Sequence, residues 1–332
     1  MRKSLSVAAA VAVLLAAGVA TGAAGGSARP LRVGLLVWSG SLSGTSRDFQ
    51  SGYVGAVRKF GWQGEIHEVG PRDTVNDGIA YFVQRHYDLI VLGTLHPLIV
   101  KIVDAAVKRF PHTRFLLPDV DPSQRRADWR EVHAYGFRIE QAAYLAGYLG
   151  GLVDKRRSGR HVVSSVSGFP EPQLVPFVAG YQAGAHRANP AVKTLNDFSY
   201  DFNAPHKCHA VALEQIGRGS GVVFDVAGVC GVGALEAARE KGVWGIGVDV
   251  DQSSLGPFVL TSVLKHEARA LSLELAAYEH GKLTPAGFDW FGYRQGAVGL
   301  GKISPRVPTA LVSKLHALET RVASGAVVVP AR

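Results

Sequence analysis

A strand–loop–helix–strand pattern in residues 222–265 constrains the fold of this chain more than any other stretch. Two short apolar runs, at 222–227 and 244–248, are each bounded by glycine, and residues 232–241 between them place apolar side chains at helical spacing. This alternation is typical of a parallel β-sheet. Because both runs are apolar almost throughout, we expect helices to cover both faces of that sheet.

Polar and glycine residues gather where these predicted strands end. A glycine-rich loop, 227–233, follows the first strand, and Asp249 and Asp251 follow the second. A third apolar run, 258–263, leads to Lys265. Ligands of open parallel sheets bind beyond the carboxyl ends of the strands, so this edge is predicted to hold a small polar molecule.

The alternation of strands and helices continues through most of the 332 residues, which are enough for two hydrophobic cores. We predict an α/β fold of two doubly wound lobes joined by three crossovers, with a ligand cleft that closes by hinge motion. The expected lobes are residues 31–136 plus 264–289 (lobe 1) and 137–263 plus 290–332 (lobe 2). The charged stretch 121–133 is predicted to be a surface loop before a strand at 134–139.

The first 28 residues differ from the rest of the chain. Arg2 and Lys3 form a basic start, residues 5–20 are apolar, and small residues follow to Ala28. This pattern predicts a secretory signal peptide at residues 1–28. The alternative is an uncleaved anchor, although the apolar run is shorter than the roughly 20 residues that span a bilayer. No cysteine follows the run, so we expect an extracytoplasmic protein without a lipid anchor.

Export makes the two cysteines candidates for a disulfide, because extracytoplasmic compartments are oxidising. Cys208 lies near the start of a predicted helix and Cys230 follows the next strand, so both fall at one edge of the predicted sheet. A disulfide and two buried thiols both stay open. A rival is a metal site that includes His206 and His209, but the spacing matches no structural zinc pattern, and we predict no metal.

Charge and motifs exclude several classes of function. The net charge is +9, but the basic residues are scattered with no block longer than 155–157, so we expect no nucleic-acid partner. Neither a GxSxG elbow nor an HExxH motif occurs, and the loop 227–233 lacks the Lys-Ser/Thr of a P-loop. We therefore predict no enzyme activity, no catalytic residues and no cofactor.

Several segments resemble the basic membrane protein family of extracytoplasmic solute-binding proteins, which includes purine-nucleoside receptors. The matching segments are FRIEQAAYLAGYLGG (137–151), FVAGYQAGAHRANP (177–190), VVFDVAGVCGVGALEAA (222–238), GIGVDVDQ (245–252) and LTSVLK (260–265). The resemblance covers nearly the whole mature chain and is strongest after residue 134. It implies the type I periplasmic-binding fold, a small-molecule ligand and an ABC transporter permease as the membrane partner. We expect a monomer.

The resemblance also implies polar ligand contacts. The aspartate of the GVDxDQ motif is Asp249, which is implied to bind ligand hydroxyls, and the lysine of TSxxK is Lys265 beside it. The aspartate that closes the fourth strand is Asp119. The structural alternatives are a helix cap for Asp249, a surface lysine for Lys265 and a turn residue for Asp119.

Aromatic and amide contacts are expected around a ligand ring. The family motif resembling DKSFN is replaced here by SRDFQ, which supplies Phe49 and Gln50, and a one-residue gap brings Tyr53 onto the family's helix aromatic. Phe169 and Trp38 each follow a predicted strand. Phe49 and Tyr53 lie one helical turn apart, so a place in the core is their alternative. The departures from the family motif leave the ligand class open.

Three functions follow from these observations. The first is a solute receptor that captures a small polar ligand, such as a nucleoside or related molecule, for an ABC importer. The second is a ligand-sensing or regulatory envelope protein of the same fold without a transporter. The third is a metal-binding envelope protein, which rests only on the His/Cys group around Cys208.

Overall fold

The computed structural model describes residues 29–38, 44–70, 74–93 and 99–332. Their contacts divide the chain into two compact units, and the chain passes between the units after Gly136, Glu267 and Asp289. Unit 1 includes Ser46–Gly136 and Ala268–Asp289, and unit 2 includes Phe137–Glu267 and Trp290–Arg332. The three passages and the two α/β units confirm the predicted fold class.

The predicted signal peptide, residues 1–28, lies outside the described residues. In the part of the chain that the structure does describe, no helix combines the length and the apolar character needed to cross a bilayer.

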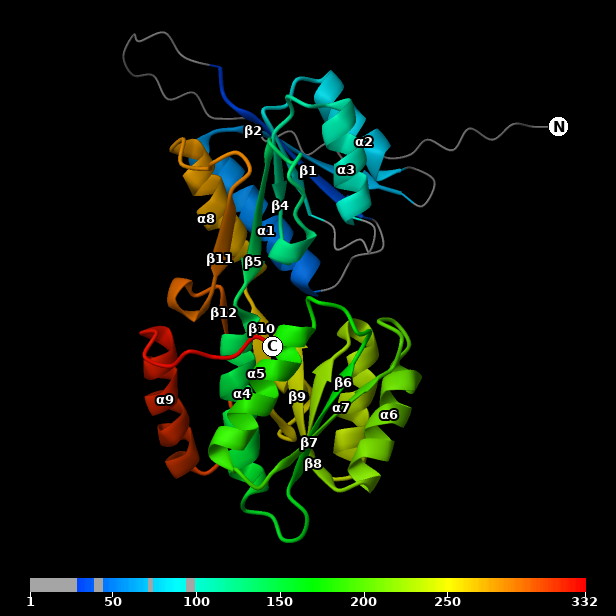
Figure 1. Ribbon diagram of the computed structural model, residues 1–332, viewed down its shortest axis with the longest axis vertical. Helices are drawn as coiled ribbons and strands as arrows, with labels where there is room; N and C mark the ends of the chain where they lie inside the picture. Colours follow the sequence, from blue (N-terminus) through cyan, green and yellow to red (C-terminus); the bar gives the residue numbers. More distant parts are fainter. Residues whose placement is uncertain (1–28, 39–43, 71–73, 94–98) are drawn as a thin grey trace, which may run out of the picture. The chain divides into compact units, whose positions relative to one another are not determined.

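Unit 1 is built on a six-stranded sheet in the order β11-β5-β4-β3-β1-β2 (Figure 1). The pairs from β2 to β5 are parallel, as predicted from the regular alternation of strands and helices. Its elements are β1 (Arg32–Trp38), α1 (Gly44–Phe60), β2 (Gln63–Val69), α2 (Val75–Gln84), β3 (Leu89–Leu92), α3 (Ile99–Arg109), β4 (Phe115–Leu117), β5 (Val132–Phe137), α8 (Glu267–Glu279) and β11 (Phe288–Phe291).

Unit 2 repeats this order in a second six-stranded sheet, β12-β10-β9-β8-β6-β7, in which only β12 is antiparallel to its neighbour. The stretch 222–265 forms its centre. The elements of unit 2 are α4 (Ile139–Asp154), β6 (Val162–Ser167), α5 (Val175–Ala188), β7 (Lys193–Phe198), α6 (Pro205–Gly217), β8 (Ser220–Val226), α7 (Gly231–Glu240), β9 (Trp244–Asp249), β10 (Val259–Lys265), β12 (Val298–Leu300) and α9 (Thr309–Ala323).

Helices cover both faces of each sheet. In unit 1, α2 and α3 pack against the sheet around Phe82 and Phe115, and α1 and α8 lie on the other face (Figure 1). In unit 2, α6 and α7 enclose a core with Val223 and Phe258, while α4 and α5 pack together on the opposite face. No residue of β6 or β8 is exposed, as expected of strands that helices cover on both faces, although β6 carries three serines and β8 carries Asp225.

One sequence prediction about unit 1 is partly wrong. The stretch 121–133 is expected to be a surface loop, but Trp129 and His133 at its end are buried, and β5 already begins at Val132. Charged neighbours in the sequence hide the start of this strand. At the opposite end of the chain, β11 joins the sheet of unit 1 and β12 joins that of unit 2, and both strands are too short for a periodicity.

Cys208 at the start of α6 and Cys230 before α7 form a disulfide, with their Cα atoms 5.6 Å apart. The disulfide is one of the two alternatives that the sequence left open, the other being two buried thiols. It also removes both thiolates from the suggested metal site with His206 and His209. Both sulfurs are buried in the core between α6, α7 and the sheet.

Loss of this disulfide is expected to destabilise the protein by about 3 kcal/mol, because a cross-link over some 22 residues restricts the unfolded chain by that amount. The measurement is the urea unfolding midpoint of the oxidised protein and of a Cys208→Ser/Cys230→Ser variant. A reducing agent should not shift the midpoint of the variant, because the chain holds no other cysteine. Equal midpoints for the two oxidised proteins would contradict this expectation.

Candidate functional site

The strand order creates a switch point in each sheet, between β6 and β8 in unit 2 and between β1 and β3 in unit 1. Ligands of doubly wound sheets bind at the carboxyl ends of the strands around this point. In unit 1, the connections after β1 and β3 include residues 39–43 and 94–98, which lie outside the described residues. In unit 2, by contrast, all the connections at the strand ends are described, and the candidate residues there are taken first.

Asp249 is the last residue of β9 and has a backbone φ of 64°. The Val250 N–H donates to the Val248 carbonyl at 2.7 Å, which closes a tight turn around Asp249. Residues other than glycine rarely adopt this left-handed conformation, and aspartate tolerates it better than most. The half-buried carboxylate thus stands at the carboxyl edge of the sheet, and the turn, not a helix N-terminus, sets its position.

The other polar residues of the GVDxDQ and TSxxK motifs hold this turn in place. The side-chain oxygen of Gln252 accepts from the Val248 N–H at 2.8 Å, and the Gln252 N–H donates to the Ser262 hydroxyl at 3.0 Å. Asp251 accepts from the Ser253 N–H at 3.0 Å, so its carboxylate is engaged by the backbone that follows it. Only Asp249 of the two acidic residues is therefore positioned as a candidate ligand contact.

Lys265 ends β10, the strand next to β9, one residue after the partner of Asp249 in the parallel register. Its side chain is buried, so it is not the surface lysine of the alternative prediction. The ammonium nitrogen lies 5.3 Å from the ring centre of Phe137 and 5.7 Å from that of Phe177, within the range of cation–π attraction. Both rings belong to segments that resemble the family, but the sequence did not indicate that these aromatic side chains lie beside Lys265.

Asp225 near the end of β8 is a buried carboxyl that the sequence analysis missed. One oxygen accepts from the Ala227 N–H at 3.0 Å, and the other has no hydrogen-bond partner among the described residues. A Cβ on Gly231 would fall 1.4 Å from the first oxygen, so the glycine of the loop makes room for this carboxyl. Burial raises the pKa of Asp225 to about 8, and the charge of Asp249 adds to the rise although the Ala227 N–H opposes it.

An aromatic group lies beyond β6 and β7, on the other side of the switch point from β9. Phe169 is half-buried, with its ring centre 5.1 Å from that of Phe202 and 6.1 Å from that of Tyr200. Tyr200 is 62% exposed and has a backbone φ of 54°. Exposed and half-buried rings in this position offer a stacking surface for a flat ligand.

Two of the aromatic candidates lie in the core of unit 1. The Tyr53 hydroxyl donates to the Val33 carbonyl at 2.5 Å and accepts from the Glu65 N–H at 2.8 Å, and burial raises its pKa. Phe49 is also buried, and a Cβ on Gly93 would fall 2.7 Å from its ring. These contacts support the alternative that Phe49 and Tyr53 are core residues, because their side chains pack α1 against the sheet.

The remaining unit 1 candidates are placed differently. Gln50 is half-buried on α1, two residues after Asp48, whose carboxylate accepts from the Ala268 N–H of α8 at 2.9 Å. Asp119 follows β4 and has a backbone φ of 53°, which fits a turn residue and also matches the conformation of Asp249. Trp38 ends β1, and its side chain lies outside the described residues.

Two doubly wound units with three chain passages are the architecture of the type I periplasmic-binding fold. A family model, Bmp, described as ABC transporter substrate-binding protein PnrA-like, matches residues 52–332. The chain belongs to this family, which confirms the resemblance found in the motifs. The family is described as one of ABC transporter substrate-binding proteins.

The protein is similar to basic membrane protein A of Borreliella afzelii, with 30% identity over 203 residues, or 58% of this chain and 60% of that protein. The chain thus spans somewhat over half the length of that relative. A solute-binding protein of an ABC transporter system from Aeropyrum pernix has a TM-score of 0.71 at 20% identity, over 91% of this chain and 94% of that one. A structure titled as a transcriptional activator of the comK gene from Bacillus halodurans has a TM-score of 0.69 at 21% identity, over 89% and 98%.

The stability of the protein without ligand is expected to fall as the pH rises from about 4 to about 8, through Asp225. In the unfolded chain an aspartate loses its proton near pH 4, whereas folded Asp225 keeps its proton to about pH 8. Between these values the unfolded state binds fewer protons, so each pH unit removes up to about 1.4 kcal/mol. Asp225→Asn should remove this slope, measured as urea unfolding at several pH values.

The matched control is Asp201→Asn in the same unit. Hydrogen bonding to Lys207 lowers the pKa of Asp201 to about 2, so its contribution changes only below pH 4. The control should keep the wild-type slope between pH 5 and pH 8. Parallel pH profiles for the wild type and Asp225→Asn would show that Asp225 is ionised in the folded state.

Proposed function

We propose that this protein captures a small polar ligand, a nucleoside or a related molecule, outside the cytoplasm and presents it to an ABC importer. The observation that carries the proposal is the pair formed by Asp249 and Lys265 at the ends of neighbouring strands in unit 2. The family supplies the class of solute-binding protein, and the chemistry of these residues suggests the ligand.

Asp249 suits the recognition of vicinal hydroxyls. A carboxylate can accept two hydrogen bonds at once, and bonds to a charged acceptor are stronger than bonds between neutral groups. The left-handed turn fixes the carboxylate at the sheet edge before a ligand arrives, which lowers the entropy lost on binding. Lys265 is held between two rings, so its positive charge is preorganised as well.

The ring of a nucleobase or similar group is proposed to stack on aromatic side chains. Phe169 and Tyr200 provide rings at the carboxyl edge of the same sheet as Asp249. Asp119, Gln50 and Trp38 of unit 1 stay predicted ligand contacts on the strength of the family resemblance. We leave Phe49 and Tyr53 out of the proposed set, because core contacts account for both.

A regulatory receptor of the same fold is the second candidate, favoured by the similarity to the transcriptional activator from Bacillus halodurans. The two functions differ in their partner. A receptor for import requires a permease and an ATPase, and deleting its gene should abolish uptake of the radiolabelled ligand. Unchanged uptake with a changed expression of other genes would favour regulation.

Replacing Asp249 by Asn is expected to reduce ligand affinity at least tenfold, about 1.4 kcal/mol, because the amide offers one acceptor oxygen and no charge. Asparagine tolerates the left-handed turn, whereas alanine would add strain that confuses the result. The ligand is first found by a thermal-shift screen of nucleosides, bases, flavins and sugars. A hundredfold excess over Kd stabilises by roughly 2.7 kcal/mol, which such a screen detects.

Asp251→Asn is the control, because it removes a charge two residues away whose carboxylate already caps the Ser253 N–H. This variant should bind the ligand like the wild type, and both variants should melt like the wild type when no ligand is present. Equal affinity of Asp249→Asn and the wild type would remove Asp249 from the site. A shift with sugars alone would reject the nucleoside assignment and keep the receptor.

A further inference from the structure

Three ligand-type side chains meet inside unit 1, apart from the proposed solute site in unit 2. His133 of β5, Glu274 of α8 and Asp289 of β11 place one nitrogen and two carboxylate oxygens within 4.8 Å of one another. The Nε2 atom of His133 lies 3.3 Å from Glu274 Oε2 and 3.2 Å from Asp289 Oδ2. Two atoms that ligate one tetrahedral zinc ion are about 3.3 Å apart, since each lies about 2.0–2.1 Å from the metal.

Two of the three groups are buried, and the atoms that face the cluster lack a hydrogen bond. Glu274 is 1% exposed and His133 is 3% exposed. Neither carboxylate oxygen of Glu274 has a hydrogen-bond partner among the described residues, and the same holds for Nε2 of His133. A buried carboxylate in this situation is strongly destabilising unless a positive charge compensates it. The Glu274 carboxylate faces the imidazole at ion-pair distance but makes no hydrogen bond, which points to a cation between the two groups.

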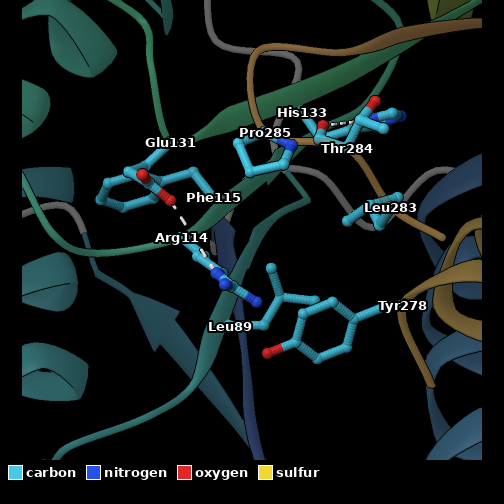
Figure 2. A pocket seen from close by; sticks show the side chains of 9 residues that line it. All are labelled: Leu89, Arg114, Phe115, Glu131, His133, Tyr278, Leu283, Thr284 and Pro285. Atoms are coloured by element: carbon cyan, nitrogen blue, oxygen red, sulfur yellow. Dashed lines mark hydrogen bonds and ion pairs between the residues drawn. The ribbon is translucent and has the colours of Figure 1, made fainter. Parts of the chain in front are cut away.

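The far side of the imidazole is arranged as in metal-binding histidines. The Nδ1 atom of His133 lies 2.9 Å from the Thr284 carbonyl, which can only accept, so Nδ1 carries a proton and Nε2 is the atom left for a metal ion or a second proton (Figure 2). A hydrogen bond from the second ring nitrogen to a backbone carbonyl fixes the ring and raises the basicity of the metal-binding nitrogen. Gly287 also fits this arrangement, because its Cβ would fall 2.5 Å from Nδ1.

We propose that His133, Glu274 and Asp289 bind a divalent transition-metal ion of the zinc class. One imidazole and two carboxylates form a donor set that suits such ions, and hard cations such as Ca²⁺ and Mg²⁺ bind oxygen donors in preference to nitrogen. The Asp289 side chain is 58% exposed, which gives the ion access from solvent and leaves room for a water or another ligand in the fourth position.

The site joins the segments through which the chain leaves unit 1. β5 ends at Phe137, where unit 2 begins, and β11 contains the passage after Asp289. These two strands are neighbours in the sheet, and Glu274 adds α8 to them. A bound ion would fix all three segments to one another, so occupancy would stabilise unit 1 and stiffen the start of two connections.

A proton on Nε2 is the rival occupant. Burial lowers the pKa of His133, but Glu274, the Thr284 carbonyl and Asp289 together raise it above its usual value. One N–H cannot point at both carboxylates, and distances of 3.2 and 3.3 Å exceed the roughly 2.7–2.9 Å of a charge-assisted N–H···O bond. The geometry therefore favours a metal ion over a proton. Titrating the protein with metal distinguishes the two, because only a metal site binds the added ion.

The experiment is a calorimetric titration of the untagged, chelator-dialysed protein with ZnCl₂. One equivalent of zinc should bind per chain and raise the melting temperature in step with the zinc concentration. Titrations with CaCl₂ and MgCl₂ at the same concentrations should give no comparable binding. The solute ligand is absent throughout, so the result is independent of the proposed receptor function.

Two variants locate the ion. Glu274→Gln and Asp289→Asn keep the size of each side chain and should each lower zinc affinity at least tenfold. Because Asp289 is exposed, its variant carries the test if Glu274→Gln does not fold. The control is Glu131→Gln, because Glu131 lines the pocket beside His133 and pairs with Arg114 outside the cluster (Figure 2). It should bind zinc like the wild type.

The proposal fails if the wild-type chain binds no zinc, in which case Nε2 holds a proton. It also fails if Asp289→Asn, together with any folded Glu274→Gln, binds one equivalent as tightly as the wild type. That result would assign the zinc to surface histidines.

Discussion

Burial of the parallel strands on both faces is the constraint on which the rest of this structure depends. β3, β4, β6 and β8 expose no residue, so helices must lie on both sides of each sheet. Polar side chains then have few positions available except the strand ends. The carboxyl edge of unit 2 gathers a carboxylate, an ammonium group and several rings for this reason. The proposed ligand contacts are therefore side chains at the strand ends, where the packing of the sheet allows polar groups.

Charge is distributed unevenly along that edge. Asp249 and Lys265 occupy neighbouring strand ends, and Asp225 lies on the next strand in a setting too apolar for a charge. A buried carboxyl that stays protonated near neutral pH can donate a hydrogen bond as well as accept one. Unit 2 therefore holds Asp225, whose proton leaves near pH 8, on the strand next to the one that ends in Asp249. A ligand bound to Asp249 would change the pKa of Asp225, because the charge of Asp249 contributes to it.

Local patterns in the sequence predicted the fold class and the placement of Asp249 and Lys265. Those predictions succeeded because strand ends and motif spacing are local properties. Asp225 escaped notice because an acidic residue inside an apolar strand has no periodic signal. Tyr53 illustrates another limit, since helical spacing shows which residues share a face and cannot show whether that face meets a ligand or the core. His133 was assigned to a loop because charged residues surround it in the sequence, while its partners come from segments more than a hundred residues away.

The edge strands β11 and β12 have a consequence for biosynthesis. Each sheet is completed by a short strand from the last fifth of the chain, at Phe288–Phe291 in one unit and at Val298–Leu300 in the other. Until these residues leave the ribosome, β5 and β10 present unpaired backbone groups at an open sheet edge, which is a template for aggregation. Unit 1 is complete in sequence only after β11, and unit 2 only with the residues that follow it. Both open edges are therefore exposed to intermolecular pairing until most of the chain has been made.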